Sequence, residues 1–177
     1  MRFRARVFGD DINTDYIIAS RRKRDSLDPQ VLRQYLFEEI APQFAAGVQA
    51  EDAIVAGKNF GCGSAMEVAV TAVLGAGIRA VLARSFARTY YRNAVNNGLL
   101  PVICDTSRIR EGDRLRLACG EPYNETCGES YNETSGEVYN ETTGETIAAE
   151  PLPQIMRAII EAGGLVPYFR QHGNFPA

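Results

Sequence analysis

The residues of this 177-residue chain that are best placed to do chemistry lie in segment 57–67, which reads GKNFGCGSAME. The segment follows a short apolar run at 53–56 and precedes a second apolar stretch, which predicts a strand, a glycine-rich turn and then a helix. Backbone N–H groups converge in such a turn and attract anions, and Gly61 and Gly63 let the backbone approach a ligand closely. The segment therefore predicts an anion-binding loop at the carboxyl end of a parallel strand.

Ser64, at the end of this loop, has two interpretations. With Glu67 three residues later it forms a capping box, in which the serine caps the following helix. Alternatively, its hydroxyl carries a proton or contacts a substrate. The residue pattern by itself favours the cap, which is the more common use of this spacing. Cys62 is interpreted as a small residue that lines the loop, with activation of its thiol as the alternative.

Strands and helices alternate around this loop. Strands are predicted at residues 1–8, 53–56, 78–83, 99–104 and 112–118; helices at 29–45, 64–75, 85–97 and 153–162; and polar loops at 9–15 and 20–28. The strand–helix–strand–helix–strand order of residues 53–104 predicts a parallel sheet with right-handed crossovers. We therefore expect an α/β fold with a central, largely parallel sheet flanked by helices.

Composition predicts a single domain over residues 1–177, since 45% of the residues are hydrophobic and the length suffices for one core. No apolar stretch is long enough to span a membrane, and no secretory leader follows the first residues, so a cytoplasmic protein is expected. The chain has one histidine and four cysteines, with no CxxC pair: His172, Cys62, Cys104, Cys119 and Cys127. We therefore expect no metal site on this chain.

Charge is unevenly distributed along the chain. Residues 121–145 contain seven glutamates and no lysine or arginine, and the remainder has 19 basic against 15 acidic residues. A cationic body suits a small anionic ligand. Nucleic acid is not expected, because no aromatic residues interleave the basic run at 21–24. The acidic segment repeats with a period of eight (EPYNETCG, ESYNETSG, EVYNETTG) and is interpreted as an insertion, either an expanded hairpin tip or an acidic loop.

Three motifs occur in a specific order: GDDINTDYII at 9–18, GKNFGCGS at 57–64 followed by Glu67, and SFARTYYRNAVNNGLLP at 85–101. Together they resemble the small subunits of isopropylmalate dehydratase and homoaconitase, and the swivelling C-terminal domain of aconitase. The resemblance covers about residues 5–118 and 145–172. It implies a swivelling β/β/α domain that serves a hydro-lyase for a 2-hydroxy diacid such as 3-isopropylmalate, an activity of leucine biosynthesis.

The resemblance also implies a division of labour between two chains. A separate large subunit binds a [4Fe–4S] cluster that acts as a Lewis acid, and this chain binds no cofactor and works only in the heteromeric complex. The alternatives are a subunit for another malate-type acid (methylmalate, dimethylmalate or homoaconitate), and a non-catalytic anion-binding or regulatory module on the same fold.

Site residues transfer from the family by position. Ser64 corresponds to the catalytic base and Asp15 to the aspartate that orients active-site groups. The expected substrate-binding residues lie in the glycine loop and in the family's specificity loop: Gly61, Cys62, Gly63, Ala65, Arg22 and Arg24. Arg24 aligns with an arginine of homoaconitase-like members, where isopropylmalate-type members have an apolar residue.

Three positions depart from the family pattern: Ala65, Met66 and Val68 replace a serine, an arginine and a histidine. An arginine binds a carboxylate through a planar fork of two hydrogen bonds, and methionine cannot. We expect either that Arg22 or Arg24 compensates or that the substrate is bound differently. The expected substrate is a malate-like diacid, which can be alkylated, rather than citrate.

Overall fold

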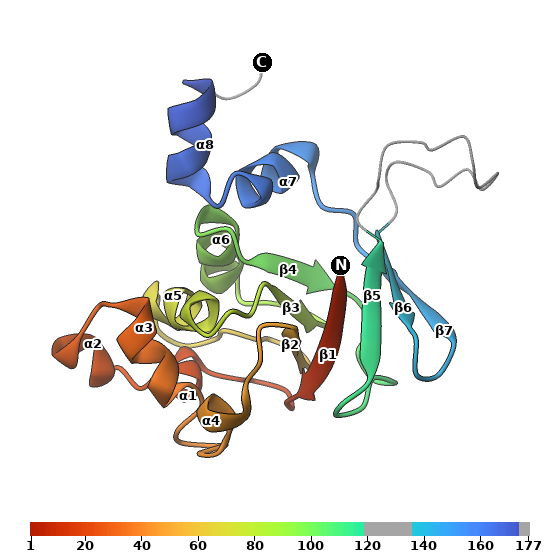
Figure 1. Ribbon diagram of the computed structural model, residues 1–177, viewed down its shortest axis with the longest axis horizontal. Helices are drawn as coiled ribbons and strands as arrows, with labels where there is room; N and C mark the ends of the chain where they lie inside the picture. Colours follow the sequence, from red (N-terminus) through yellow and green to blue (C-terminus); the bar gives the residue numbers. More distant parts are fainter. Residues whose placement is uncertain (119–135, 174–177) are drawn as a thin grey trace.

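One seven-stranded sheet organises the computed structural model, which describes residues 1–118 and 136–173 (Figure 1). Its strands are β1 (Arg2–Val7), β2 (Asp52–Ala56), β3 (Ala80–Ala83), β4 (Leu100–Ile103), β5 (Arg114–Ala118), β6 (Gly136–Asn140) and β7 (Glu145–Ala149). Their order is β4-β3-β2-β1-β5-β6-β7. The pairs from β4 to β1 are parallel and the pairs from β1 to β7 are antiparallel. The predicted parallel sheet is thus confirmed, and an antiparallel meander extends it.

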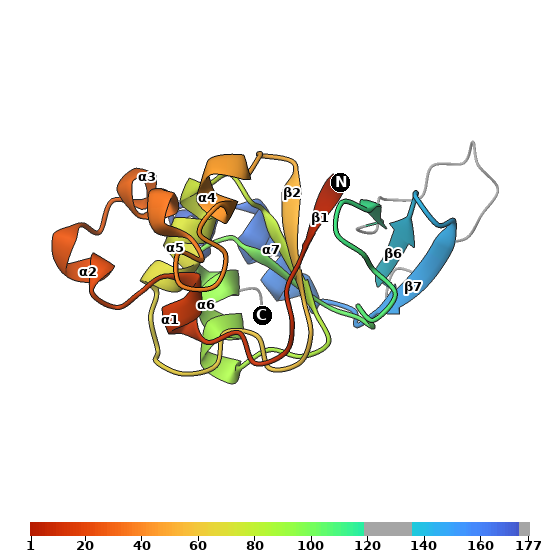
Figure 2. The ribbon, with the colours of Figure 1, turned by 90° about the horizontal axis from the view of Figure 1, so that it is seen from below.

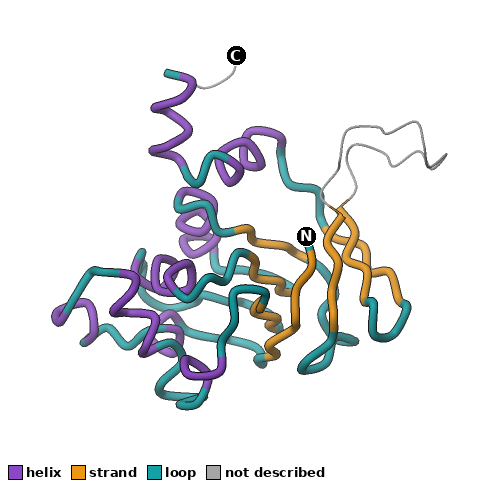
Figure 3. The backbone as a smooth tube through the Cα atoms, in the orientation of Figure 1, coloured by secondary structure: helices purple, strands orange, loops and turns teal. Residues whose placement is uncertain are grey.

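The helices are mostly short. They are α1 (Thr14–Ile17), α2 (Arg22–Asp25), α3 (Pro29–Leu32), the 3₁₀ helix η1 (Arg33–Tyr35), α4 (Phe44–Gly47), α5 (Val68–Gly75), α6 (Arg88–Asn96), α7 (Gln154–Glu161) and α8 (Leu165–His172). Most of them gather on one side of the molecule, and the antiparallel strands lie at the opposite end (Figures 2 and 3). None of the helices in the described residues is long and apolar enough to cross a membrane.

Strand β2 shows why the parallel strands read as continuous apolar runs. Ile54 and Ala56 point into a core formed with α1, α3, α5 and α6. Ala53 and Val55 point to the opposite face, into a second core formed with the antiparallel strands and α7. Successive side chains of a strand alternate between faces, so a strand buried on both faces needs apolar residues at every step. The predicted α/β architecture with helices flanking a central sheet is confirmed.

Parallel pairing also decides which loops lie together at one edge of the sheet. Ala5 pairs with Ala53, and Ile54 pairs with Val81, so β1, β2 and β3 end at one edge of the sheet. The loops that leave these strands therefore start side by side. The motifs found in the sequence at 9–18, 57–67 and 85–101 begin in these loops.

The single helix predicted at 29–45 is wrong. The chain forms α3 and η1, reverses at Phe37, and resumes as α4. Phe37 has a φ of 56° and is fully buried, stacked on Phe8 with ring centroids 4.2 Å apart. Burial of this ring outweighs helix continuation, and Pro42 disfavours helical backbone at the residue before it. Two further differences are α2, which lies in a predicted loop, and α8, which follows the predicted closing helix.

The last copy of the acidic repeat, residues 137–144, forms most of β6 and the turn that leads into β7. Asn140 is fully buried; its Nδ2 donates to Asp113, and its Oδ1 accepts the backbone N–H groups of Thr142 and Thr143. Gly144 ends the turn with a φ of 77°. The rest of the repeat lies in 119–135, outside the described residues. Its assignment as an insertion in a single domain of residues 1–177 therefore stays a prediction.

Candidate active site

Two adjacent carboxylates fix the start of the glycine loop. Asp10 accepts hydrogen bonds from the backbone N–H of Lys58 and from Nη2 of Arg84, both at 2.7 Å. These two donors hold the pKa of Asp10 below its ordinary value. Asp11 accepts a hydrogen bond from Nδ2 of Asn59 at 2.8 Å. The loop after β1 therefore fastens the loop after β2, and the loop after β3 joins them through Arg84.

The glycines of the loop allow close contact with two other segments. Gly61 has a φ of 76°, and a Cβ placed there would lie 2.2 Å from the ring of Tyr90 in α6. Gly63 has a φ of 89°, and its Cβ would lie 2.5 Å from Oδ1 of Asn13. A positive φ and the absence of space both require glycine at these positions. The loop is therefore held between α6 and the segment that precedes α1.

Ser64 does not cap α5, so the capping-box interpretation is wrong. The helix begins at Val68, its N-cap residue is Glu67, and no side chain caps it. Residues 64–66 instead form a tight turn in which the backbone N–H of Met66 donates to the carbonyl of Ser64 at 2.8 Å. The Ser64 side chain is exposed, and its hydroxyl has no hydrogen bond to any residue in the described ranges. Ser64 is therefore available for chemistry.

Three consecutive backbone donors lie at this serine and its two neighbours. The N–H groups of Gly63, Ser64 and Ala65 have no acceptor within residues 1–118 and 136–173, and all three residues are exposed. Such a run of free donors binds anions. Cys62 lies beside them, half-buried, and burial together with the charge of Asp11 raises the pKa of its thiol. A raised pKa does not favour activation of this thiol, and the role of Cys62 as a small residue that lines the loop stays a prediction.

Asn13, two residues before Asp15, pairs with the glycine loop and so brings Asp15 close to that loop. Asn13 and Cys62 form an isolated parallel bridge. Oδ1 of Asn13 accepts the backbone N–H of Asp15 at 2.9 Å and so caps α1. The Asp15 carboxylate is half-buried and accepts the N–H of Ser20 at 3.0 Å. The structure thus brings Asp15 and the glycine loop to the same edge of the sheet.

The two arginines of the predicted specificity loop differ in their contacts. Arg22 donates to both carboxylate oxygens of Glu38, at 3.0 and 2.6 Å, and its guanidinium lies 3.7 Å above the ring of Tyr35. Arg24 is exposed and forms no ion pair in the described part of the chain. This geometry favours Arg24 over Arg22 as a contact for an anionic substrate, and both roles stay predictions.

Met66 is 5% exposed and belongs to the core beneath the loop, with Ile12, Ile17 and Phe60. A side chain of this kind adds packing and no charge. The substrate carboxylate that the family's arginine would bind must therefore find another cation, or the substrate differs at this end.

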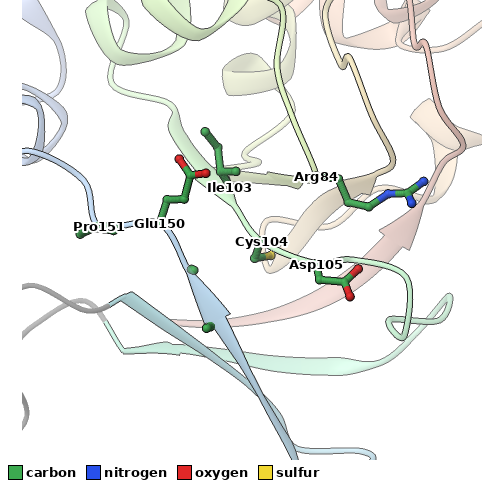
Figure 4. Close-up of a pocket in the computed structure, with 8 residues that line it drawn as sticks. Arg84, Ile103, Cys104, Asp105, Glu150 and Pro151 are labelled. Atoms are coloured by element: carbon green, nitrogen blue, oxygen red, sulfur yellow. The ribbon is translucent and has the colours of Figure 1, made fainter.

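No group of three or more histidine, cysteine or acidic side chains in the described residues is arranged to hold a metal ion. An open pocket lies between the end of β4 and the segment after β7 (Figure 4). It is lined by Arg84, Ile103, Cys104, Asp105, Ala148, Ala149, Glu150 and Pro151. Arg84 is the one residue of this lining that also contacts the loops of the candidate site.

Sequence reasoning missed three residues that organise the site: Asp10, Asp11 and Arg84. The aspartates stand in a motif that was recognised, but their partners are distant in the sequence. The signal available was the pair of acidic residues directly after a strand, a position where parallel sheets place functional loops.

Comparisons with known proteins identify relatives of this chain. Residues 37–107 match the aconitase C-terminal domain family. The chain is 43% identical over 175 residues to 3-isopropylmalate dehydratase small subunit 1 of Methanopyrus kandleri, covering 98% of this chain and 94% of the relative. It is 39% identical over 168 residues to the methanogen homoaconitase small subunit of Methanocaldococcus jannaschii, covering 95% and 90%.

A solved structure is also similar to this chain in sequence and in fold. The crystal structure of 3-isopropylmalate dehydratase from Methanocaldococcus jannaschii superposes with a TM-score of 0.81 at 37% identity, covering 97% of this chain and 94% of that one. The chain therefore belongs to the aconitase C-terminal domain family, among its 3-isopropylmalate dehydratase and homoaconitase small subunits. The resemblance noted from the three motifs is confirmed.

Proposed function

We propose that this chain is the small subunit of a hydro-lyase that dehydrates and rehydrates a malate-type 2-hydroxy diacid, with 3-isopropylmalate as the first candidate. One observation supports this above the others: the Ser64 hydroxyl is exposed and unpaired among the described residues, and the free N–H groups of Gly63 and Ala65 flank it. The names of the relatives agree with this reaction class.

The chemistry follows from the serine and its donors. Dehydration removes a proton from the carbon next to the one that loses its hydroxyl. Ser64 Oγ accepts that proton, and the neighbouring N–H groups lower the free energy of the negatively charged oxygen that takes it. Asp15, held by Asn13 and Ser20, orients the groups around the reacting carbon. Rehydration returns the proton along the same path.

Loss of the substrate's hydroxyl group needs a Lewis acid from a second chain. A [4Fe–4S] cluster on a large subunit would act as its Lewis acid. The described residues of this chain do not offer the three cysteines that such a cluster needs. We therefore expect the isolated chain to be inactive and the complex to be active.

The test is reconstitution of the full chain with a cluster-loaded large subunit, followed by assays with isopropylmalate, methylmalate, dimethylmalate and homocitrate. Turnover of at least one diacid by the complex, and of none by the separate chains, is the expected result. Inactivity of a correctly assembled complex on all four would overturn the proposal, and activity of the isolated chain would overturn the division of labour.

The contacts of α2 give a prediction about substrate binding. Arg24→Ala is expected to raise KM about tenfold with little change in kcat, because a charged hydrogen bond to the substrate is lost in both the ground and transition states. Lys23→Ala, one position earlier on the same exposed helix, is the matched control and is expected to leave KM unchanged. A larger rise in KM for Arg22→Ala than for Arg24→Ala would contradict this assignment.

A non-catalytic anion-binding or regulatory module is the second candidate. Ala65 and the buried Met66 favour it, since they replace two polar residues of the family pattern. A Ser64→Ala variant separates the two candidates, because only the catalytic one needs the hydroxyl.

A further inference from the structure

Thr14 connects the start of α1 to both sides of Ser64. It is 2% exposed. Its backbone N–H donates to the carbonyl of Cys62 at 2.8 Å, and its Oγ1 donates to the carbonyl of Ser64 at 2.9 Å. One buried residue thus binds two alternate carbonyls of the glycine loop.

These two bonds fix the directions of two peptide planes. In a planar trans peptide the C=O and the N–H of the same unit point in opposite directions. The carbonyl of Cys62 shares its plane with the N–H of Gly63, and the carbonyl of Ser64 shares its plane with the N–H of Ala65. Because Thr14 holds both carbonyls inward, both N–H groups point away from it, and neither has an acceptor in the described residues.

We propose that Thr14 is a positioning residue that turns the two N–H groups flanking Ser64 toward the ligand. The proposal rests on the proposed function, because it assigns those donors to the anionic substrate or to the charged serine oxygen. Thr14 also begins the helix that contains Asp15, so it links the orientation of the donors to the placement of that aspartate.

A purely structural role for Thr14 is the alternative, and the chain offers a way to distinguish the two. Thr14→Val keeps the side-chain shape and the backbone bond to Cys62. It removes the hydroxyl bond to the Ser64 carbonyl, together with the longer contact of 3.5 Å from the hydroxyl to Oδ1 of Asn13. Thr14→Ser keeps the hydroxyl. Thr106 is the matched control: it is 7% exposed, and its Oγ1 donates to the carbonyl of Ala56 at 2.7 Å, outside residues 61–65.

The first experiment measures Tm, kcat and KM of the reconstituted complex. Thr14→Val is expected to lower kcat by about tenfold to a hundredfold, as small misplacements of catalytic groups do. Thr14→Ser is expected to restore kcat to near the wild-type value. Thr106→Val is expected to lower Tm by a similar amount with kcat unchanged. If Thr14→Val lowers Tm and leaves kcat unchanged, the proposal is wrong.

A second experiment does not depend on activity. In ¹⁵N NMR spectra of the full chain alone, Thr14→Val is expected to move the amide signal of Ala65 strongly and that of Gly63 weakly, since the bond to Cys62 remains. Equal shifts at both amides, or none at Ala65, would overturn the positioning role. A wild-type complex that is inactive on all diacids would instead refute the proposed function and leave this result to stand by itself.

Discussion

Replacing Ser64 with alanine is expected to lower kcat of the reconstituted complex by about a thousandfold, because the proton acceptor is lost while the surrounding donors remain. The hydroxyl has no hydrogen bond to any described residue of the protein, so its removal leaves no buried group unsatisfied. Tm and assembly with the large subunit should therefore stay unchanged. KM should change little, since the effect is on the transition state.

Ser107→Ala is a suitable control for that measurement. Ser107 is exposed and lies in the turn after β4, where its backbone N–H donates to Asp105. Both variants are compared by steady-state kinetics and size-exclusion chromatography. An unchanged kcat for Ser64→Ala in an intact complex would exclude the serine as a base and would favour the non-catalytic candidate.

Gly61→Ala is expected to have the largest effect on folding, a loss of about 3 kcal/mol in the free energy of unfolding from backbone strain and overpacking together. The added Cβ would overlap the ring of Tyr90, which is fully enclosed and packs edge-on against Phe60 with ring centroids 5.1 Å apart. Burial raises the pKa of the Tyr90 hydroxyl, which has no hydrogen-bond partner in the described residues.

Gly112→Ala separates strain from overlap. Gly112 has a φ of 84°, close to the 76° of Gly61, but a Cβ there would meet nothing within 4 Å. Its substitution is expected to cost about 1 kcal/mol, from backbone strain alone. Chemical denaturation of both variants gives the difference. Equal losses for the two would show that Tyr90 does not require glycine at position 61.

The sequence was sufficient for the features that depend on local pattern. Strand β2, helix α5 and the parallel order of the sheet were predicted, since apolar periodicity and chain order determine them. The glycine loop was also placed correctly at the end of β2. These predictions need no knowledge of which distant residues touch.

Features that depend on long-range contacts were not predictable in the same way. Ser64 fits a capping box locally, yet its carbonyl is bound by Thr14, fifty positions earlier, and the helix starts four residues later than expected. In the sequence, Arg22 and Arg24 are equivalent candidates for binding a substrate, whereas in the structure Arg22 pairs with Glu38. Phe37 interrupts a predicted helix because its ring completes an aromatic cluster with Phe8 and Phe44. In each case a tertiary contact outweighs a local preference.

The burial of Met66 has a consequence for substitutions at this position. A Met66→Arg substitution would place a guanidinium in the core cluster that contains Ile12 and Ile17, whose buried members are all hydrophobic. An unpaired buried charge costs several kcal/mol. The arginine of the family pattern is therefore expected to lower the free energy of unfolding at this position, and its introduction would require other changes in the surrounding core. Folding stability therefore restricts which side chains position 66 can accept.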